Sequence, residues 1–297
     1  MKMKYEVVII GGSYAGLSAA LPLARARRQI LIVDAGQRRN RFAEHSHNFL
    51  TQDGRSPSSI AEEARAQVEK YSTVSWLFET VTDVKALEDQ YLVIAGEQHI
   101  QAKKIIIATG VKDELPPVEG LAERWGKSIY HCPYCDGYEL NLGEIGVLAS
   151  GMHSLHQALM LPDWGNTTLF LNDKINTNEL DDEILAKLSK RQVLIETRKI
   201  SRIEGHCDVV FTDGERMTVN GLFVATVTRL QANWIRDLGL EIDSNEYGEA
   251  IKTSPTKETN VKGVYACGDV TRSGGSVALS VGDGAMTGIV AHKSLIF

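Results

Sequence analysis

The sequence contains few cysteines and prolines and no long hydrophobic run. Among its 297 residues are 4 cysteines and 7 prolines, and no apolar stretch approaches the roughly 20 residues that a bilayer span needs. The short apolar run Tyr5–Ile10 leads directly into Gly11-Gly12 without a cleavage-type segment, which is typical of a first β-strand and not of a signal peptide. We therefore expect a cytoplasmic protein with no membrane partner, whose cysteines are thiols.

The balance of charge excludes a further class of partner. The net charge is −6, charged residues make up 24% and hydrophobic residues 43%. These values are ordinary for a globular protein and give no reason to expect nucleic acid as a partner. The chain is long enough for one large or two modest domains.

Two units of strand, turn, helix and strand predict an α/β fold with two Rossmann-like nucleotide-binding domains. The first unit runs from the strand Tyr5–Ile10 to the strand Ile30–Val33, and the second runs from Gly146–Leu148 to Thr167–Leu171. The paired prolines of Leu115-Pro116-Pro117 mark the first domain boundary, because they stop regular structure.

The turn of the first unit, Gly11–Gly16, is typical of a dinucleotide site. Its glycines let the backbone approach a pyrophosphate at a helix N-terminus, and Asp34 ends the next strand, where an acid can bind ribose hydroxyls. Later, Cys267-Gly268-Asp269 follows a strand and Gly274-Gly275-Ser276 opens a helix, so Asp269 is a second candidate for binding cofactor hydroxyls. The alternatives are an ordinary turn with incidental glycines and an Asp that caps a helix.

The turn of the second unit matches a nucleotide site less well. Ala149 replaces the first glycine, Gly151 keeps the middle position, and Ser154 stands at the small-residue position. The following strand ends in Asn172-Asp173-Lys174, without the arginines that a 2′-phosphate needs. If a nicotinamide dinucleotide binds here, Asp173 favours NADH over NADPH. The alternative is a nucleotide fold that has lost its ligand.

The segment Cys132-Pro133-Tyr134-Cys135, followed by Asp136, indicates redox chemistry. Two thiols at this spacing can close a disulfide, and a position of Cys132 at a helix start would favour its thiolate. Asp136 is the candidate general acid/base, and His131 is the second candidate for that role. A zinc site needs four ligands, and no second pair stands at usable spacing, so we predict no metal. An inert reduced pair is the remaining alternative.

These motifs, in this order, resemble the low-molecular-weight thioredoxin reductase family of FAD-dependent pyridine nucleotide-disulfide oxidoreductases. The resemblance covers nearly the whole chain. It implies a discontinuous FAD-binding domain of the three-layer ββα type, formed by residues 1–113 and 240–297. It also implies an inserted NAD(P)-type domain, residues 114–239, that carries the Cys132/Cys135 redox disulfide. The family resemblance further implies a homodimer and a domain rotation that presents Cys135 to the flavin or Cys132 to a partner protein.

The resemblance also implies which residues contact the cofactor. The residues expected to bind FAD are Gly11, Gly12, Ser13, Ala15, Gly16, Asp34, Ala35, Asn48, Ala108, Thr109, Gly110, Gly268, Asp269, Ser276 and Val277. The stretch His45–Gly54 is similar to relatives that oxidise small-molecule dithiols to disulfides and pass the electrons from the flavin to oxygen.

Several positions depart from the family pattern. The family reductases carry Gly-x-Gly-x-x-Ala and a His-Arg-Arg stretch where this chain has Ala149-Ser150-Gly151 and Asn172-Asp173-Lys174. Thr226-Val227-Thr228 stands where a glycine is usual, and Gly275-Ser276 where an Arg-Gln pair is usual. FAD binding is compatible with these changes. NADPH or NADH stays open as the electron donor, and so does a donor that is not a nicotinamide, such as reduced ferredoxin.

The sequence therefore predicts an FAD-dependent disulfide oxidoreductase with Cys132, Cys135 and Asp136 as its catalytic residues. Electrons would pass between the flavin and the cysteine pair, and on to a thioredoxin-like protein or a small-molecule dithiol or disulfide. Two alternatives are a small-molecule dithiol oxidase that uses oxygen and a flavin-binding redox sensor. The sequence leaves open the electron donor and the direction of electron flow.

Overall fold

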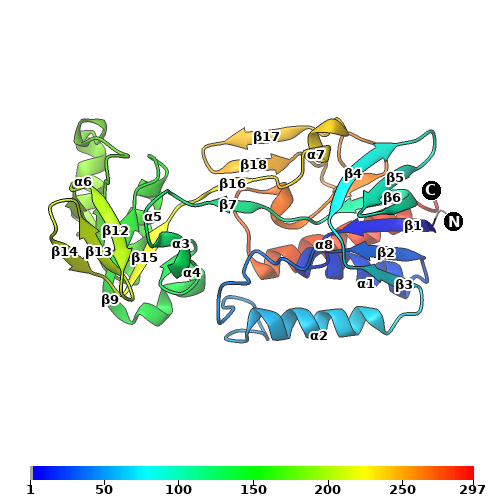
Figure 1. The fold of residues 1–297 in the computed structure, drawn as a ribbon, viewed down its shortest axis with the longest axis horizontal. Coiled ribbons are helices and arrows are strands. Elements are labelled where there is room, and N and C mark those ends of the chain that lie inside the picture. The colour runs from blue at the N-terminus through cyan, green and yellow to red at the C-terminus, as the bar shows by residue number, and fades with distance from the viewer. Residues whose placement is uncertain (1–2) are drawn as a thin grey trace. The chain divides into compact units, whose positions relative to one another are not determined.

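The structure is a computed structural model that describes residues 3–297, and the chain forms two compact units (Figure 1). The first unit contains the chain up to Arg41 together with Phe49–Lys112 and Thr228–Phe297, and the second contains Phe42–Asn48 and Asp113–Val227. The chain thus changes unit at 112/113 and 227/228, and the short segment Phe42–Asn48 belongs to the second unit. Which unit binds which nucleotide stays a prediction.

A seven-stranded sheet forms the centre of the first unit (Figure 1). Strands β3, β2, β1 and β6 are parallel neighbours in that order, and β5 and β4 extend the sheet by antiparallel pairing. The long strand β6 pairs with β5 through residues 98–102 and with β19, in parallel, through residues 105–107. The strand bounds are β1 Met3–Ile10, β2 Ile30–Val33, β3 Val74–Leu77, β4 Val81–Ala86, β5 Tyr91–Ala95, β6 Gln98–Ile107 and β19 Val264–Ala266.

The apolar runs in this sequence form parallel strands because both faces of the sheet are covered. Every residue of β2 is buried, and Val7, Val8 and Ile9 of β1 are fully buried. Continuous hydrophobic runs of this kind are typical of parallel strands, whereas half-exposed antiparallel strands alternate. The burial of β5 does alternate along Tyr91–Ala95.

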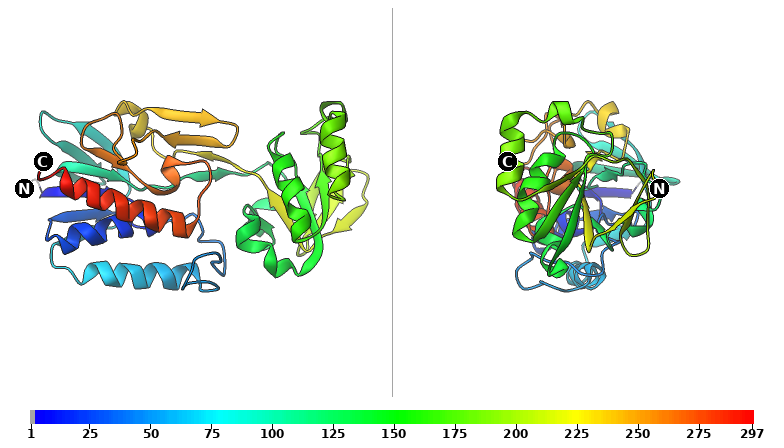
Figure 2. Two further views of the ribbon diagram at one scale, coloured as in Figure 1. Left: turned by 180° about the vertical axis from the view of Figure 1, so that it is seen from behind. Right: turned by 90° about the vertical axis from the view of Figure 1, so that its left-hand side faces the viewer.

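Helix α8 (Val277–Lys293) packs against α1 (Tyr14–Arg25), as the red and dark blue helices of Figure 2 show. The contact depends on two glycines of α8. A Cβ atom on Gly284 would overlap the carbonyl oxygen of Ala15, and one on Gly288 would overlap that of Ala19. The remaining helices of this unit are α2 Pro57–Glu69, α7 Trp234–Asp237 and the 3₁₀ turn η4 Gly268–Thr271.

A smaller sheet of four strands has the order β17-β18-β16-β7. The chain leaves the first unit after residue 112, within β7, and returns to it at residue 228, within β16. Both of these strands belong to this sheet. The bounds are β7 Lys112–Glu114, β16 Val227–Arg229, β17 Ile242–Asn245 and β18 Gly248–Ile251.

The second unit has a parallel sheet of five strands in the order β11-β10-β9-β15-β8 and an antiparallel sheet of three, β12-β13-β14. The strands are β8 Ile129–Tyr130, β9 Leu142–Leu148, β10 Gly165–Phe170, β11 Leu194–Glu196, β12 Ile200–Glu204, β13 Asp208–Phe211, β14 Arg216–Thr218 and β15 Gly221–Val224. The helices are α3 Leu121–Arg124, α4 Pro133–Asp136, α5 Ser154–Met160 and α6 Asp182–Lys190, with 3₁₀ turns η1 Tyr138–Leu140, η2 Leu161–Asp163 and η3 Thr177–Glu179.

The predicted α/β class with two Rossmann-like units is confirmed, and the differences concern element ends. The helix of the second strand-turn-helix-strand unit, α5, ends at Met160, and the chain continues as a 3₁₀ turn that contains Pro162. Proline has no N–H to donate and clashes with the preceding helical turn, so the α-helix ends before it. The predicted helix Ser276–Leu295 spans Val277–Lys293, because Ser276 is its N-cap and accepts a hydrogen bond from the amide of Leu279.

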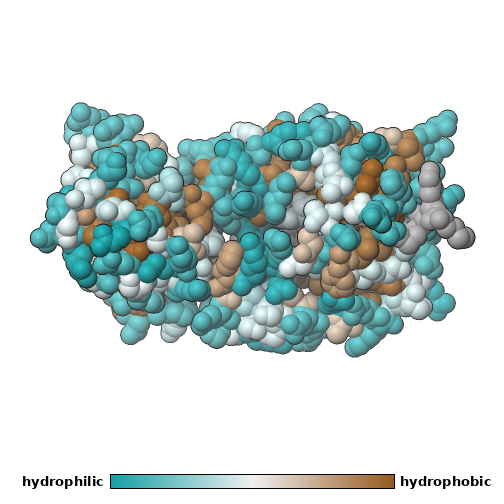
Figure 3. Space-filling model, viewed as in Figure 1, coloured by the Kyte–Doolittle hydropathy of each residue, from teal (hydrophilic) through white to brown (hydrophobic). Residues whose placement is uncertain are grey.

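One face of the molecule is drawn in Figure 3, where hydrophilic residues are interspersed with hydrophobic ones. Within residues 3–297, no helix combines the length and the hydrophobicity that a membrane crossing requires.

We expect Gly284→Ala to destabilise the protein because the added methyl group would overlap the Ala15 carbonyl oxygen and lie 3.0 Å from the Ser18 Cβ atom. Over-packing of this kind costs about 1–3 kcal/mol of the free energy of unfolding. The matched control is Gly282→Ala in the same helix, where nothing lies within 4 Å of the new Cβ atom, and a gain of about 0.5–1 kcal/mol is expected. Denaturant unfolding of both variants measures the difference, and equal stability would contradict the close contact between α1 and α8.

Candidate active site

The turn between β1 and α1 leaves no room for side chains at its glycine positions. Gly11 has φ +105°, a conformation that other residues avoid, and a Cβ atom there would overlap the carbonyl oxygen of Ala108. A Cβ atom on Gly12 would lie 2.7 Å from the Trp76 ring, and one on Gly16 would overlap the Gly11 carbonyl oxygen. The turn leads into a 12-residue helix whose first amide groups have no acceptor within the helix. It therefore has the geometry that brings a backbone close to an anionic group.

Parallel pairing brings the other predicted cofactor residues to the same edge of the sheet. Strand β6 ends beside β1, with Ile107 opposite Ile10, so the following Ala108-Thr109-Gly110 lies next to the Gly11 turn. Asp34 and Ala35 follow β2, and the Asp34 amide donates to the Leu77 carbonyl oxygen at 3.0 Å. A carboxylate at this strand end suits ribose hydroxyls.

The Gly268-Asp269 turn follows β19, which is also a parallel neighbour of β6. Gly268 has φ +79°, and a Cβ atom there would lie 2.8 Å from that of Ala15, so the late turn touches the first one. The Asp269 carboxylate accepts a hydrogen bond from Arg39 at 2.8 Å and another from Ser280 at 3.3 Å.

Two of the predicted cofactor residues differ from this group. Val277 packs with Tyr14 and Ile60 in a small apolar cluster, so its side chain is used in packing. Asn48 lies in the second compact unit, and its place in a cofactor site stays a prediction. The others lie at four strand ends and two helix starts. Their tight glycine turns and carboxylates are of the kind that fits a dinucleotide such as FAD.

Cys132 is the N-cap of α4, and Pro133 occupies its first turn, as predicted. The Cys135 amide donates to the Cys132 carbonyl oxygen at 3.1 Å, which folds the two cysteines into one turn. Both are half-buried thiols. A hydrogen bond from the Cys135 side chain lowers the pKa of Cys132, although burial opposes this effect. The net effect favours the thiolate form of Cys132.

The Asp136 carboxyl group is positioned to gain or lose a proton near neutral pH. Its pKa is raised to about 7, chiefly by burial and also by the charge of Glu139, while His47 acts in the opposite direction. The His47 Nε2 atom lies 3.4 Å from a Glu139 carboxylate oxygen. A group with this pKa suits general acid/base catalysis. The His131 Nδ1 atom lies 3.3 Å from both the Val224 carbonyl oxygen and the Thr226 hydroxyl group, at the end of β15.

The turn after β9 forms hydrogen bonds mainly to itself and to the end of β15. The Ser150 hydroxyl group donates to the Ala225 carbonyl oxygen at 2.6 Å, and the His153 Nε2 atom lies 3.0 Å from the same oxygen. The His153 ring also lies 3.0 Å from where a Cβ atom of Gly151 would stand, so the ring covers the glycine of the turn. At the end of β10, the Asn172 side chain accepts a hydrogen bond from the Ile200 amide at 2.8 Å and is buried.

The two cysteines outside the pair are chemically quiet. Burial raises the pKa of both Cys207 and Cys267 to about 12, so neither forms a thiolate near neutral pH. Within residues 3–297, no group of three or more His, Cys, Asp or Glu side chains is arranged to hold a metal ion.

Sequence reasoning did not single out Arg39, Glu139 or Asp283, and it included His47 only as part of the stretch His45–Gly54. Arg39 and His47 lie in the long polar loop between β2 and α2, which motif analysis cannot resolve residue by residue. Glu139 follows the cysteine pair by four positions, and its only signal was that closeness. Asp283 is the single acidic residue of helix α8, where most residues are apolar or small, and that isolation was a usable signal.

Known proteins with similar sequences include disulfide oxidoreductases, the class that the cysteine pair and the glycine turns indicate. The sequence profile of the family described as "Pyridine nucleotide-disulphide oxidoreductase" matches residues 5–291. The curated "Thioredoxin reductase sirT" of Leptosphaeria maculans is 32% identical over 307 residues, covering 96% of this chain and 92% of the relative.

Two solved structures are similar over nearly the whole chain. An oxidoreductase from Agrobacterium tumefaciens has 51% identity and a TM-score of 0.96, with 99% of both chains covered. The structure of HlmI has 32% identity and a TM-score of 0.92, with 99% of this chain and 93% of HlmI covered. The resemblance predicted from sequence is confirmed, and the chain belongs to the pyridine nucleotide-disulphide oxidoreductase family as a thioredoxin reductase-like flavin enzyme that acts on sulfur groups.

Proposed function

We propose that the Cys132/Cys135 pair exchanges electrons with bound FAD and with an external dithiol, and that a nicotinamide nucleotide is not the electron donor. FAD, when bound, supplies a two-electron acceptor and donor for the cysteine pair. The residues proposed to hold it are Gly11–Gly16, Asp34, Ala108–Gly110 and Gly268-Asp269. The turn supports this role because a side chain on Gly11, Gly12 or Gly16 would clash with its surroundings.

The turn after β9 is the observation that favours an external dithiol over a nicotinamide nucleotide. A nicotinamide site needs free backbone donors at this turn and a ribose partner at the end of the next strand. Here the Ser150 amide already donates to the Ser154 hydroxyl group at 3.0 Å, and the Ser150 and His153 side chains bond to the Ala225 carbonyl oxygen. The Asn172 side chain accepts from the Ile200 amide. The similarity of His45–Gly54 to dithiol-oxidising relatives supports the same direction of electron flow, with oxygen as the final acceptor.

The exchange chemistry can be written so that it balances. A thiolate of the external dithiol attacks the sulfur of Cys132 in the Cys132–Cys135 disulfide, and Cys135 leaves as a thiolate. The second external thiol then attacks the mixed disulfide, which releases the oxidised substrate and the Cys132 thiolate. Two electrons have entered the cysteine pair, and Asp136 takes up one of the two protons. The pair would return to the disulfide by giving up these two electrons. FAD, when bound, would supply the acceptor, and oxygen would be the final acceptor, which takes the two electrons and two protons to become hydrogen peroxide.

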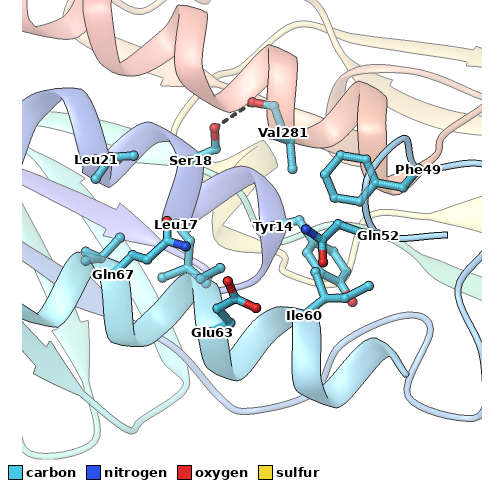
Figure 4. Close-up of a pocket in the computed structure, with 12 residues that line it drawn as sticks. Tyr14, Leu17, Ser18, Leu21, Phe49, Gln52, Ile60, Glu63, Gln67 and Val281 are labelled. Carbon is cyan, nitrogen blue, oxygen red and sulfur yellow. Dashed lines mark hydrogen bonds between the residues drawn. The ribbon is translucent and has the colours of Figure 1, made fainter. Parts of the chain in front are cut away.

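The proposal also includes a homodimer, as the family resemblance implies. Leu279, Met286 and Ile289 are exposed apolar residues on α8, and a groove beside this helix is lined by side chains of α1 and α2 (Figure 4). Tyr14, Phe49 and Ile60 line one end of that groove, and the Ser18 hydroxyl group bonds to the Val281 carbonyl oxygen at 2.6 Å. A second copy is the occupant we propose, and its test is the molar mass in solution. The cytoplasmic location stays a prediction.

The function is tested by mixing the purified yellow protein, without oxygen, with a small dithiol, NADPH, NADH or reduced ferredoxin. We expect the dithiol to remove the flavin absorbance rapidly, and NADPH to act slowly or not at all. With oxygen present, about one hydrogen peroxide should form for each dithiol oxidised. Rapid bleaching by NADPH would instead identify a reductase, and absence of turnover with every donor would favour the redox sensor.

The roles of the two cysteines are tested by trapping a mixed disulfide. In Cys135→Ser the resolving thiol is lost, so Cys132 should accumulate a stable adduct with a small activated disulfide. In Cys132→Ser the adduct should form at least about tenfold more slowly, because the thiol whose pKa is lowered, and which we propose as the exchanging nucleophile, is absent. Mass spectrometry of the intact protein measures both. Equal capture by the two variants would reverse the assignment.

The role of Asp136 predicts a specific dependence on pH. The folded-state pKa of about 7 lies above the ordinary aspartate pKa of 3.8, so the folded protein binds this proton more tightly than the unfolded chain. The free energy of unfolding should therefore fall as the pH rises from about 4 to about 7, and then level off. Asp136→Asn should lack this fall and also lose the inflection near neutral pH in the rate of dithiol oxidation.

A matched variant separates this effect from a general loss of structure. Glu139 raises the pKa of Asp136, so Glu139→Gln should move the inflection to lower pH without abolishing it. Stability and rate profiles measured across the same pH range decide the point. Profiles of Asp136→Asn that coincide with those of the wild type would rule out Asp136 as the titrating group.

A further inference from the structure

Asp283 is a nearly buried carboxylate in the middle of α8, with 5% of its side chain exposed. One of its oxygens lies 2.5 Å from the Lys257 ammonium group and 2.8 Å from the Arg272 guanidinium group. The other accepts a hydrogen bond from the Gly268 amide at 2.8 Å and lies 3.4 Å from the Thr271 hydroxyl group. A charge buried to this degree is costly unless it is paired and hydrogen-bonded on each side, as this one is.

The carboxylate is ionised in this setting. Burial raises the pKa of Asp283, but the hydrogen bonds from Lys257 and Gly268 and the charges of Arg272 and Lys257 outweigh burial and lower the pKa overall. Cys267, which precedes the turn, is fully buried beside the carboxylate and keeps its proton. The Asp283 carboxylate is therefore a fixed negative charge next to the backbone of the Gly268-Asp269 turn.

The atoms that Asp283 holds belong to the Gly268-Asp269 turn. Gly268 has φ +79° and lies against Ala15 of the first glycine turn, so it has little freedom to shift. The next residue, Asp269, is the carboxylate that the proposed function assigns to the cofactor. On the far side of the turn, Ser280 of α8 donates to Asp269 at 3.3 Å. Helix α8 thus contacts the turn at two points: Asp283 binds the backbone of Gly268, and Ser280 binds the side chain of Asp269.

We propose that Asp283 is a positioning residue for the flavin site: with Lys257 and Arg272 it fixes the backbone of Gly268, and so sets the direction of the Asp269 carboxylate toward the cofactor. The inference rests on the proposed function, because it assumes that FAD occupies this turn. It assigns to α8 a second role besides packing against α1, and it assigns to Lys257 and Arg272 a role that no motif of the chain indicated.

A carboxylate is required because every partner of Asp283 is a donor. Asn at this position would keep one acceptor oxygen but would turn an NH₂ group toward either the two cations or the Gly268 amide. Glu would keep the charge and both acceptors, displaced by one methylene group. A charge-assisted hydrogen bond to a buried group is among the strongest single contacts in a protein, so its loss should be measurable at the cofactor.

The test measures release of FAD from the holoprotein by the rise in flavin fluorescence, together with the visible circular dichroism of the bound flavin. We expect Asp283→Asn to release FAD at least about tenfold faster and to alter the dichroism, whereas Asp283→Glu should restore most of both. Lys257→Met removes one cation and should accelerate release by about threefold or more. Asp163→Asn, which breaks an exposed ion pair with Arg191 in the second unit, should release FAD at the wild-type rate.

Two results would overturn the inference. One is an Asp283→Asn holoprotein that unfolds at a lower temperature yet releases FAD at the wild-type rate with an unchanged spectrum, which would show a purely structural ion cluster. If that variant does not fold, wild-type release and dichroism in Lys257→Met would have the same meaning. A wild-type protein that binds no FAD would instead refute the proposed function, so the two failures are distinguishable.

Discussion

The candidate cofactor site depends on the parallel pairing of three strands that are far apart in the sequence. Strand β6 has β1 on one side and the end of β19 on the other, so residues 10, 107 and 266 stand in register. Parallel strands end at the same edge of a sheet, and the turns that follow them must meet there. Without this pairing, the Gly11 turn, Ala108–Gly110 and the Gly268 turn would be three unrelated loops.

Close packing of α8 on α1 adds a second constraint to the same region. Gly284 and Gly288 let the two helix backbones approach, and that approach brings Asp283 and Ser280 to the Gly268 turn. The packing of two helices and the geometry of the turn are therefore linked. The glycines of α8 therefore act in two ways: they allow close helix packing, and they let neighbouring polar residues of α8 reach the turn.

The Gly-rich turns after β1 and β9 differ in structure, although both follow a buried parallel strand. The first is a backbone cradle whose glycines cannot accept side chains. In the second, the hydroxyl group of Ser150 and the ring of His153 bond to the Ala225 carbonyl oxygen, just after the neighbouring strand β15. The cysteine pair also lies in the second unit.

The sequence alone determined the fold class, the order of the strand and helix units, the tight turn at Gly11 and the close spacing of Cys132 and Cys135, because each of these depends on local spacing and residue type. Only the tertiary structure placed His47 and Glu139 near Asp136, paired Arg39 with Asp269 and buried Asp283 against Lys257 and Arg272. These contacts join residues far apart in the chain or shift a pKa through burial. Burial and long-range pairing are properties of the folded chain, and no local pattern encodes them.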